Sequence, residues 1–346
     1  MNAMLKAFLS ALVVAAFVLP SSALAAKKVS CKGIKAEHVL RFSTVAPANT
    51  PWARLLKNYK KVIRKKSNCR IKVKVSLGGM KGSNELGIVR LVRKGKELEA
   101  GGVSSGAIAN QVRELDLLEL PYLFNSAAEA DRILDGVALP FVEKALEAQG
   151  FKLLMYSENG YRSMGTKGFQ VSSPRDLVGK KMRSQESDAH VATWRAFGAS
   201  PVTMSVGEVM SALQTGNVTG FDNTPLYTQA VSWYQAIDHF TLTRHIYQPA
   251  VIVANKRWFD GLPADLQEIL VTTGRKLQGK GRTKIRALDD ALLENFKEFG
   301  IQVHELSPAQ RAVFQKASRK VWDTMAKKTT PLGRQLLSAI RKELGR

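Results

Sequence analysis

The chain has 346 residues, of which 45% are hydrophobic, and its formal net charge is +23. A chain of this length can bury a large core and commonly divides into two domains. After residue 25 no segment offers eighteen uninterrupted apolar residues, which excludes an ordinary transmembrane helix from that part of the sequence.

Residues 1–25 have the pattern of a secretory signal. They contain Lys6, an apolar run over 7–19 and a small-x-small site that ends at Ala25. We therefore expect cleavage near Ala25 and Ala26, followed by export. The residues before Cys31 do not form a lipobox, so we expect no lipid anchor.

Cys31 and Cys69 are the two cysteines of the sequence. Export to an oxidising compartment favours a disulfide between them, which would tie the start of the mature chain to the end of its first helix. Two unpaired buried thiols are the alternative. No His or Cys lies at ligand spacing from either cysteine, so we expect no metal site.

The first part of the mature chain alternates strands and helices. We predict strands over 39–45, 71–77 and 97–103, a helix over 52–66, and a second helix capped by Ser83. Residues 71–77 alternate apolar and polar side chains, which is typical of a half-buried strand. This βαβαβ order predicts a mainly parallel sheet with helices on its faces.

Ligands of such sheets bind beyond the carboxyl ends of the strands. This rule places the loop over 46–50 and the segment around Ser104 and Ser105 at the mouth of a cleft. Asn49 and the two serines are therefore candidate ligand-binding residues, with ordinary turn chemistry as the alternative.

The chain then enters a predicted second domain. Ser126 and Glu129 form a capping box that opens a helix extending to residue 149, and strands are predicted over 151–157 and 161–166. Glu158 and Tyr161 flank Arg162, so both are candidates for supporting this arginine or for forming the wall of a binding cavity.

Residues 177–225 contain the two strongest candidates for the site. Ser173 opens a predicted short helix, and predicted strands over 180–184 and 218–222 bring in Arg183 and Asn223. A guanidinium fork matches a carboxylate through two parallel hydrogen bonds. A solvated or salt-bridged arginine, and a capping role for Asn223, are the alternatives.

Two further helices are predicted within this segment. They cover 187–197 and the residues after the capping box of Ser205 and Glu208, as far as Gly216.

The last part of the chain is predicted to cross back. We expect a strand over 247–255, a long helix over 263–300, a brief strand over 301–304, and helices from Ser307 and Pro331. Two or more crossings would make a hinge between two α/β lobes that can close over a small ligand.

We therefore predict an α/β fold of two hinged lobes, with mixed, mainly parallel sheets and a long C-terminal helical region. Lobe I lies mainly in 26–157 and lobe II mainly in 158–246. Residues 247–346 contribute the crossing strand and helices that pack across both lobes.

The sequence carries no signature of catalysis or of a cofactor. It contains no HExxH helix, no G-x-S-x-G elbow and no phosphate loop, so we expect neither catalytic residues nor a cofactor. The basic charge suggests nucleic-acid binding. Export argues against that partner, and the basic run over 57–66 is more simply a solvated helix face. Contact with an anionic membrane surface is another consequence of such charge.

Several phrases resemble one known family when taken together and in order. The segments are LRFSTVAPANTPW, IKVKVSLGGMKGSNEL, LDLLELPYLF, ENGYR, GKKMRSQES, FGASPVTM, SVGEVMSALQTGNVTGFDNTP and FTLTRHIYQPAVIVANKRWFDGLP. They are similar to the substrate-binding subunits of tripartite ATP-independent periplasmic (TRAP) transporters, the DctP family of family 7 extracellular solute-binding proteins.

The resemblance implies the two-lobed periplasmic-binding-protein fold and roles for three residues. In that family an arginine of a "KxR" strand binds the substrate carboxylate, helped by an arginine of a "GxR" phrase and by an asparagine after a "DG" turn. These roles fall on Arg183, Arg162 and Asn223. Thr219 stands where the family usually has the aspartate of that turn.

The function implied is that of a periplasmic receptor rather than an enzyme. It would capture a small organic carboxylate between its lobes and deliver it to membrane permease subunits, for uptake coupled to an ion gradient. Two alternatives stay open from the residues: a lipid-like or weakly polar ligand in the same fold, and an exported lyase or hydrolase. A role in sensing is not distinguishable from transport by sequence.

Overall fold

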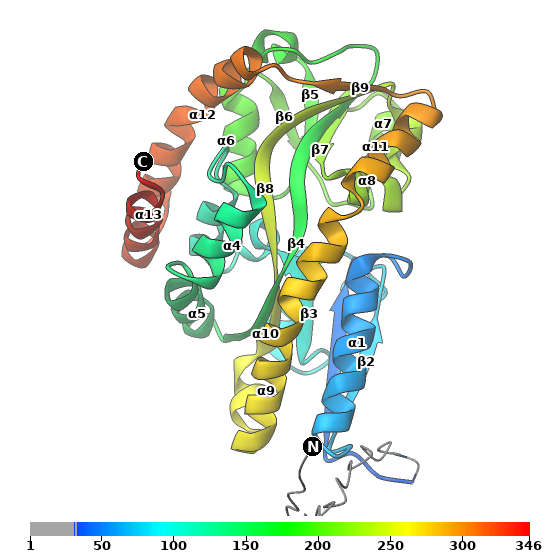
Figure 1. Ribbon diagram of the computed structural model, residues 1–346, viewed down its shortest axis with the longest axis vertical. Coiled ribbons are helices and arrows are strands. Elements are labelled where there is room, and N and C mark those ends of the chain that lie inside the picture. The colour runs from blue at the N-terminus through cyan, green and yellow to red at the C-terminus, as the bar shows by residue number, and fades with distance from the viewer. Residues whose placement is uncertain (1–30, 32) are drawn as a thin grey trace, which may run out of the picture.

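The computed structural model describes Cys31 and residues 33–346, so the predicted signal sequence lies outside the described residues. Two long antiparallel strands, β4 (Phe151–Thr166) and β8 (His239–Asn255), run side by side through the length of the molecule (Figure 1). They form the centre of one mixed sheet.

Two parallel groups of strands flank this central pair, in the order β2-β1-β3-β8-β4-β7-β5-β6. The strands are β1 (His38–Thr44), β2 (Ile71–Ser76), β3 (Ala100–Ser104), β5 (Lys181–Ser184), β6 (Ser200–Thr203) and β7 (Gly220–Asn223). We call β2-β1-β3 the first half-sheet and β7-β5-β6 the second. A further strand, β9 (Gln302–Glu305), pairs parallel to β8.

Helices cover both faces of the sheet (Figure 1). They are α1 (Pro51–Lys66), α2 (Glu85–Lys94), α3 (Ser105–Ile108), α4 (Ala127–Asp135), α5 (Leu139–Ala148), α6 (Asp188–Ala196), α7 (Val209–Gln214), α8 (Pro225–Ala230), α9 (Lys256–Asp260), α10 (Ala264–Arg286), α11 (Asp289–Glu298), α12 (Pro308–Lys328) and α13 (Pro331–Leu344). Short 3₁₀ segments are η1 (Arg113–Glu119), η2 (Pro174–Leu177) and η3 (Trp233–Ala236). No helix in the described part of the chain is both long and apolar enough to cross a bilayer.

Helix α1 shows how the sequence sets these elements. The Thr50 hydroxyl caps its first turn by accepting from the Ala53 amide at 3.3 Å, and a proline follows at the first helical position. Its apolar side chains, among them Leu56, Tyr59 and Ile63, are buried against β1, β2 and α10. The opposite side of the helix is exposed and basic.

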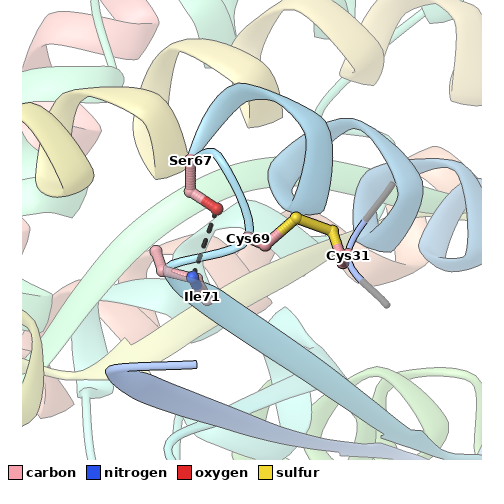
Figure 2. Close-up of a disulfide and its surroundings, with 4 residues drawn as sticks. All are labelled: Cys31, Ser67, Cys69 and Ile71. Atoms are coloured by element: carbon pink, nitrogen blue, oxygen red, sulfur yellow. Dashed lines mark hydrogen bonds between the residues drawn. A yellow bond between two sulfur atoms is a disulfide. The ribbon is translucent and has the colours of Figure 1, made fainter. Parts of the chain in front are cut away.

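A disulfide joins Cys31 to Cys69 just after α1 (Figure 2). Its Cα atoms lie 5.7 Å apart, a distance typical of a disulfide. Cys69 has a positive φ of 68°, and the turn closes when the Ser67 hydroxyl accepts from the Ile71 amide at 3.2 Å (Figure 2). The bridge fixes the chain before β1 to the turn between α1 and β2.

Several elements differ from the prediction in their bounds. The helix predicted over 126–149 is two helices, because the chain turns at Gly136 and Pro140 then occupies the start of α5. The long helix predicted over 263–300 is likewise α10 followed by α11. The segment opened by Ser173 is 3₁₀, and Asn84 rather than Ser83 caps α2.

The largest difference lies in β4. Two strands were expected over 151–157 and 161–166, but the chain forms one strand with a register shift between Glu158 and Gly160. Gly160 has a φ of +102°, which lets the backbone absorb an extra residue without leaving the sheet.

Candidate ligand-binding site

The carboxyl ends of strands from both half-sheets meet at one cavity. Thr44 and Ser104 lie at the ends of β1 and β3, while Asn223 ends β7 and Gln185 directly follows β5. This is the edge at which parallel sheets usually bind ligands. Arg162 of β4 and Arg183 of β5 also line the cavity.

Arg162 is buried and fully paired within the protein. Its Nε donates to the Asp222 carboxylate at 2.5 Å, and one terminal nitrogen donates to the backbone carbonyl of Asp222. The other terminal nitrogen donates to Gln248 at 2.8 Å and lies 3.5 Å from the Asn223 side-chain oxygen. The charge of Arg162 is therefore balanced by Asp222.

Asp222 remains a carboxylate although it is completely buried. Burial alone would raise its pKa, but the Arg162 guanidinium and a hydrogen bond with His245 hold the pKa of this carboxyl well below its usual range. Burial lowers the pKa of His245, whose Nε2 lies 3.4 Å from Asp222.

Arg183 is equally buried but forms no ion pair with any acidic side chain in the described part of the chain. Its Nε and one terminal nitrogen donate to the Met204 carbonyl at 3.2 and 2.9 Å, and its guanidinium lies 5.5 Å from the centre of the Trp233 ring. The second terminal nitrogen has no hydrogen-bond partner among the described residues. Burial, assisted by the charge of Arg162, lowers the pKa of Arg183 to about 10, so the side chain stays cationic at neutral pH.

A network of amides and carboxylates holds the cavity wall between the half-sheets. Gln248 donates to Glu119 at 2.8 Å and to Gln185 at 2.9 Å, and Gln185 donates to the Ser104 hydroxyl at 2.9 Å. Burial alone would raise the pKa of Glu119, but hydrogen bonds from His190 and Ser105 hold it below its usual value. The two half-sheets are thus joined by polar contacts next to the cavity.

Glu85 supplies the one carboxylate among the residues that line the cavity. Its oxygens accept from the Ser104 amide at 2.6 Å and from the Ser104 hydroxyl at 3.1 Å. Burial raises the pKa of this carboxyl, partly offset by the bonds from Ser104. Trp52 and Tyr227, whose ring centres are 6.1 Å apart, add an aromatic wall.

The predicted residues divide into two groups. Four of them line the cavity: Arg162, Arg183, Asn223 and Ser104. The other four do not line it and have different contacts.

Two of these four lie on β4 beside Arg162. The carboxylate of Glu158 is bound by Arg286, at 2.9 Å from its Nε, and by the Tyr247 hydroxyl. The Tyr161 hydroxyl donates to the Phe124 carbonyl at 3.1 Å. Both side chains are therefore committed to packing away from the cavity.

The two loop residues are also placed elsewhere. The Ser105 hydroxyl is buried 2.6 Å from the Glu119 carboxylate, where it helps to hold that side chain. Asn49 is exposed, and its backbone carbonyl accepts from Arg54. The strand-end rule predicts the region of a site, but it does not determine which neighbouring side chain points inward.

Several cavity residues were not predicted: Asn159, Gln185, Gln248, Glu85 and Tyr227. Two of them had a usable signal. Gln185 directly follows a predicted strand, and Gln248 is a lone amide within the apolar run IYQPAVIVA. A buried polar side chain in such a run requires partners, and these often belong to a site.

Asp116 of η1, next to this network, gives a pH-dependent prediction. It is 5% exposed, and burial raises its pKa to about 6 despite a hydrogen bond from Ser187 at 2.6 Å. Its folded pKa thus exceeds the unfolded value near 3.9, so the folded state binds more protons between those values and stability falls as pH rises from about 4 to about 6. The fall in the free energy of unfolding over this pH range should be about 3 kcal/mol smaller in Asp116→Asn than in the wild type, because the variant has no carboxyl group at this position.

Urea unfolding at several pH values between about 4 and 7 would measure the effect. Asp188→Asn, at an exposed position in the same region, is the matched control. Its free energy of unfolding should change with pH as that of the wild type does. If the free energy of unfolding of Asp116→Asn changed with pH as that of the wild type does, this result would contradict the raised pKa of Asp116.

The chain is similar to known proteins over most of its length. Residues 42–329 match the family model described as bacterial extracellular solute-binding protein, family 7. A solute-binding protein of Verminephrobacter eiseniae is 33% identical over 255 residues, covering 74% of this chain and 75% of that protein. The 2,3-diketo-L-gulonate-binding periplasmic protein YiaO of Escherichia coli is 28% identical over 285 residues, covering 82% and 85%.

Solved structures agree with the architecture. A TRAP periplasmic solute-binding protein from a Sulfitobacter species, with bound β-D-galacturonate, has a TM-score of 0.83 at 25% identity and covers 88% of this chain and 99% of that one. The sugar acid binding protein DctPAm from Advenella mimigardefordensis, in complex with galactonate, has a TM-score of 0.82 at 26% identity and covers 88% and 98%. The predicted two-lobed α/β fold is confirmed by this likeness.

Proposed function

The chain belongs to the bacterial extracellular solute-binding proteins of family 7, and we propose that its cavity binds a small organic acid through Arg183. The family consists of receptor subunits of TRAP transporters, so the chain is a binding protein and not an enzyme. Its place is the periplasm, and its partners are the membrane permease subunits that take up the ligand.

The observation that carries the proposal is the unpaired donor of Arg183. A buried cation without an anion is costly unless a ligand supplies the negative charge. A carboxylate at this nitrogen would balance Arg183, as Asp222 already balances Arg162. Asn223, beside Arg162 on the cavity wall, would orient the bound group.

Glu85 narrows the ligand class to acids with a single carboxylate and a hydroxyl-bearing tail. After Arg183 is paired, the remaining acidic group on the wall is Glu85, whose oxygens accept hydrogen bonds and whose ionised form repels a second anion. Sugar acids fit this pattern. The relatives from Sulfitobacter and Advenella were solved with galacturonate and galactonate, which supports the same class here.

We further propose that 26–157 and 158–246 form the main parts of two lobes that close over the ligand, with residues 247–346 packed across both. Closure would remove water from the cavity and strengthen the ion pair at Arg183.

Calorimetric titration of the mature protein with D-galactonate, D-glucuronate, succinate and neutral galactose tests the proposal. We expect the sugar acids to bind, succinate to bind more weakly, and galactose not to bind. Galactose bound as tightly as galactonate, or a lipid released from the purified protein on denaturation, would overturn it in favour of a weakly polar ligand.

Glu85→Gln should change the selectivity of the cavity. Removing this negative charge is expected to improve the affinity for succinate relative to galactonate by about ten- to thirty-fold, because the repulsion of a second carboxylate is lost. The ratio of the two dissociation constants is the measurement. Glu97→Gln, at an exposed position without an ion pair, is the control. An unchanged ratio would mean that Glu85 does not contact the tail of the ligand.

A further inference from the structure

One stretch at an edge of the molecule contributes +10 of the formal net charge of +23. Residues 51–76, which form α1, the turn after it and β2, contain ten Lys and Arg residues and no Asp or Glu. Strand β2 is the end strand of the sheet, and α1 lies beside it (Figure 1). Among the described residues, Arg70 alone of the ten forms ion pairs, with Glu37 and Asp265.

The other nine side chains are exposed and share this edge; we call them the basic face. They are Arg54, Lys57, Lys60, Lys61, Arg64, Lys65, Lys66, Lys72 and Lys74. On α1 they recur at helical spacing opposite the buried apolar residues, and on β2 they alternate with Ile71 and Val73, which are buried. Folding therefore leaves the cations unpaired at the surface.

Part of the basic face is hollowed. Lys60 and Arg64 of α1 and Lys72 and Lys74 of β2 line one hollow of the surface, with no carboxylate among its lining residues. Four cations around one hollow favour a group that carries several anionic oxygens, such as a phosphate.

We propose that the basic face binds the phosphate headgroups of an anionic phospholipid surface. Seven of its nine residues are lysines, which are depleted in protein–protein interfaces, whereas aromatic residues are enriched there. The aromatic residues of α1, Trp52 and Tyr59, are buried, so the face offers no aromatic anchor to a protein partner. Flexible lysines without an anchor fit a fluid layer of headgroups.

The packing of α1 determines how the face binds. Because Leu56, Tyr59 and Ile63 already pack into the core, the helix has no free apolar side to insert between acyl chains. Binding is therefore purely electrostatic, confined to the headgroup layer, and sensitive to salt. It does not involve the ligand cavity.

Cosedimentation with lipid vesicles tests the proposal. The mature protein is mixed with vesicles of phosphatidylcholine alone, or of equal parts phosphatidylcholine and phosphatidylglycerol, at low salt and again in about 0.5 M salt, where screening is strong. We expect binding to the phosphatidylglycerol vesicles at low salt only.

Two matched variants locate the surface. Each replaces four exposed lysines with glutamine, which has a similar helix propensity, and so loses the same charge. The test variant carries Lys57→Gln, Lys60→Gln, Lys61→Gln and Lys65→Gln on α1, and the control carries Lys316→Gln, Lys320→Gln, Lys327→Gln and Lys342→Gln on α12 and α13. We expect the test variant to lose at least about one hundred-fold in vesicle affinity and the control less than about five-fold. Both should bind galactonate as the wild type does.

Four outcomes would overturn the proposal. Equal losses in the two variants would assign binding to net charge rather than to this face. Binding to vesicles made only of phosphatidylcholine would exclude an anionic headgroup surface as the partner. The absence of binding to either kind of vesicle would exclude it as well. If inorganic phosphate, at the same concentration as the lipid phosphate, displaced the protein from the vesicles, the hollow would be assigned to a free anion. Tighter binding of soluble polyglutamate than of vesicles would assign the face to an acidic protein.

Discussion

Replacing Arg183 with methionine is expected to abolish carboxylate binding while leaving the ligand-free protein at least as stable as the wild type. The wild-type guanidinium is buried with one nitrogen unpaired, and burial lowers its pKa to about 10. Removing this charge relieves a desolvation cost, so the free energy of unfolding without ligand should be unchanged or rise by about 1 to 2 kcal/mol. Affinity should fall by about 2 to 5 kcal/mol, or roughly 30- to 5,000-fold.

Calorimetric titration with galactonate and urea unfolding without ligand measure the two effects separately. Arg175→Met, at an exposed arginine on η2, is the matched control and should change neither. Affinity within about threefold of the wild type would mean that Arg183 is not the anchor. A strongly destabilised variant would instead mean that Arg183 is a structural cation, whatever it does for the ligand.

Asp222→Asn is expected to have the opposite effect, a large loss of stability. The substitution leaves the buried guanidinium of Arg162 without its counter-charge, and breaking a buried pair from one side costs about 3 to 5 kcal/mol. Asp323→Asn, which breaks an exposed pair with Arg341, should cost less than about 1 kcal/mol. Urea unfolding at neutral pH compares the two variants.

The pH dependence of Asp222→Asn identifies the cause. The folded pKa of Asp222 is depressed, so its contribution is complete above the unfolded value near 3.9 and is lost as pH falls toward the folded value. The gap between wild type and Asp222→Asn should therefore narrow below about pH 4. Adding Arg162→Met to Asp222→Asn should recover most of the loss, because the orphaned charge is removed. No recovery would contradict the ion-pair explanation.

These two arginines illustrate what could be predicted from the sequence. The alternation of strands and helices was sufficient to predict the α/β class and a cleft beyond the strand ends, whereas the role of Arg183 was implied by the family resemblance. The sequence did not allow us to predict that Arg162 forms an ion pair within the protein while Arg183 keeps one nitrogen unpaired. The ion pair depends on Asp222, which lies 60 positions from Arg162 in sequence and reaches it through the pairing of β4 with β7.

The positions of Glu158 and Tyr161 on β4 have a related cause. A regular strand alternates its faces with period two, so one extra residue exchanges the inner and outer side chains. The register shift between Glu158 and Gly160 leaves Asn159 in the cavity wall while Glu158 binds Arg286. The sequence motif Asn-Gly was visible, but the shift becomes apparent only when the strand is paired with β8.

The unbroken course of β4 and β8 restricts how the cavity can open. Neither strand ends between the half-sheets, so separating the halves would have to deform a two-stranded ribbon that is paired from Phe151 and Asn255 at one end to Thr166 and His239 at the other. Such a ribbon bends normal to its plane far more easily than within it, which gives the movement a preferred direction. The deformation is least costly where the ladder is already irregular, and register shifts lie on both sides of Arg162. A bend of the ribbon would therefore be concentrated beside the side chain that fixes the charge balance of the site.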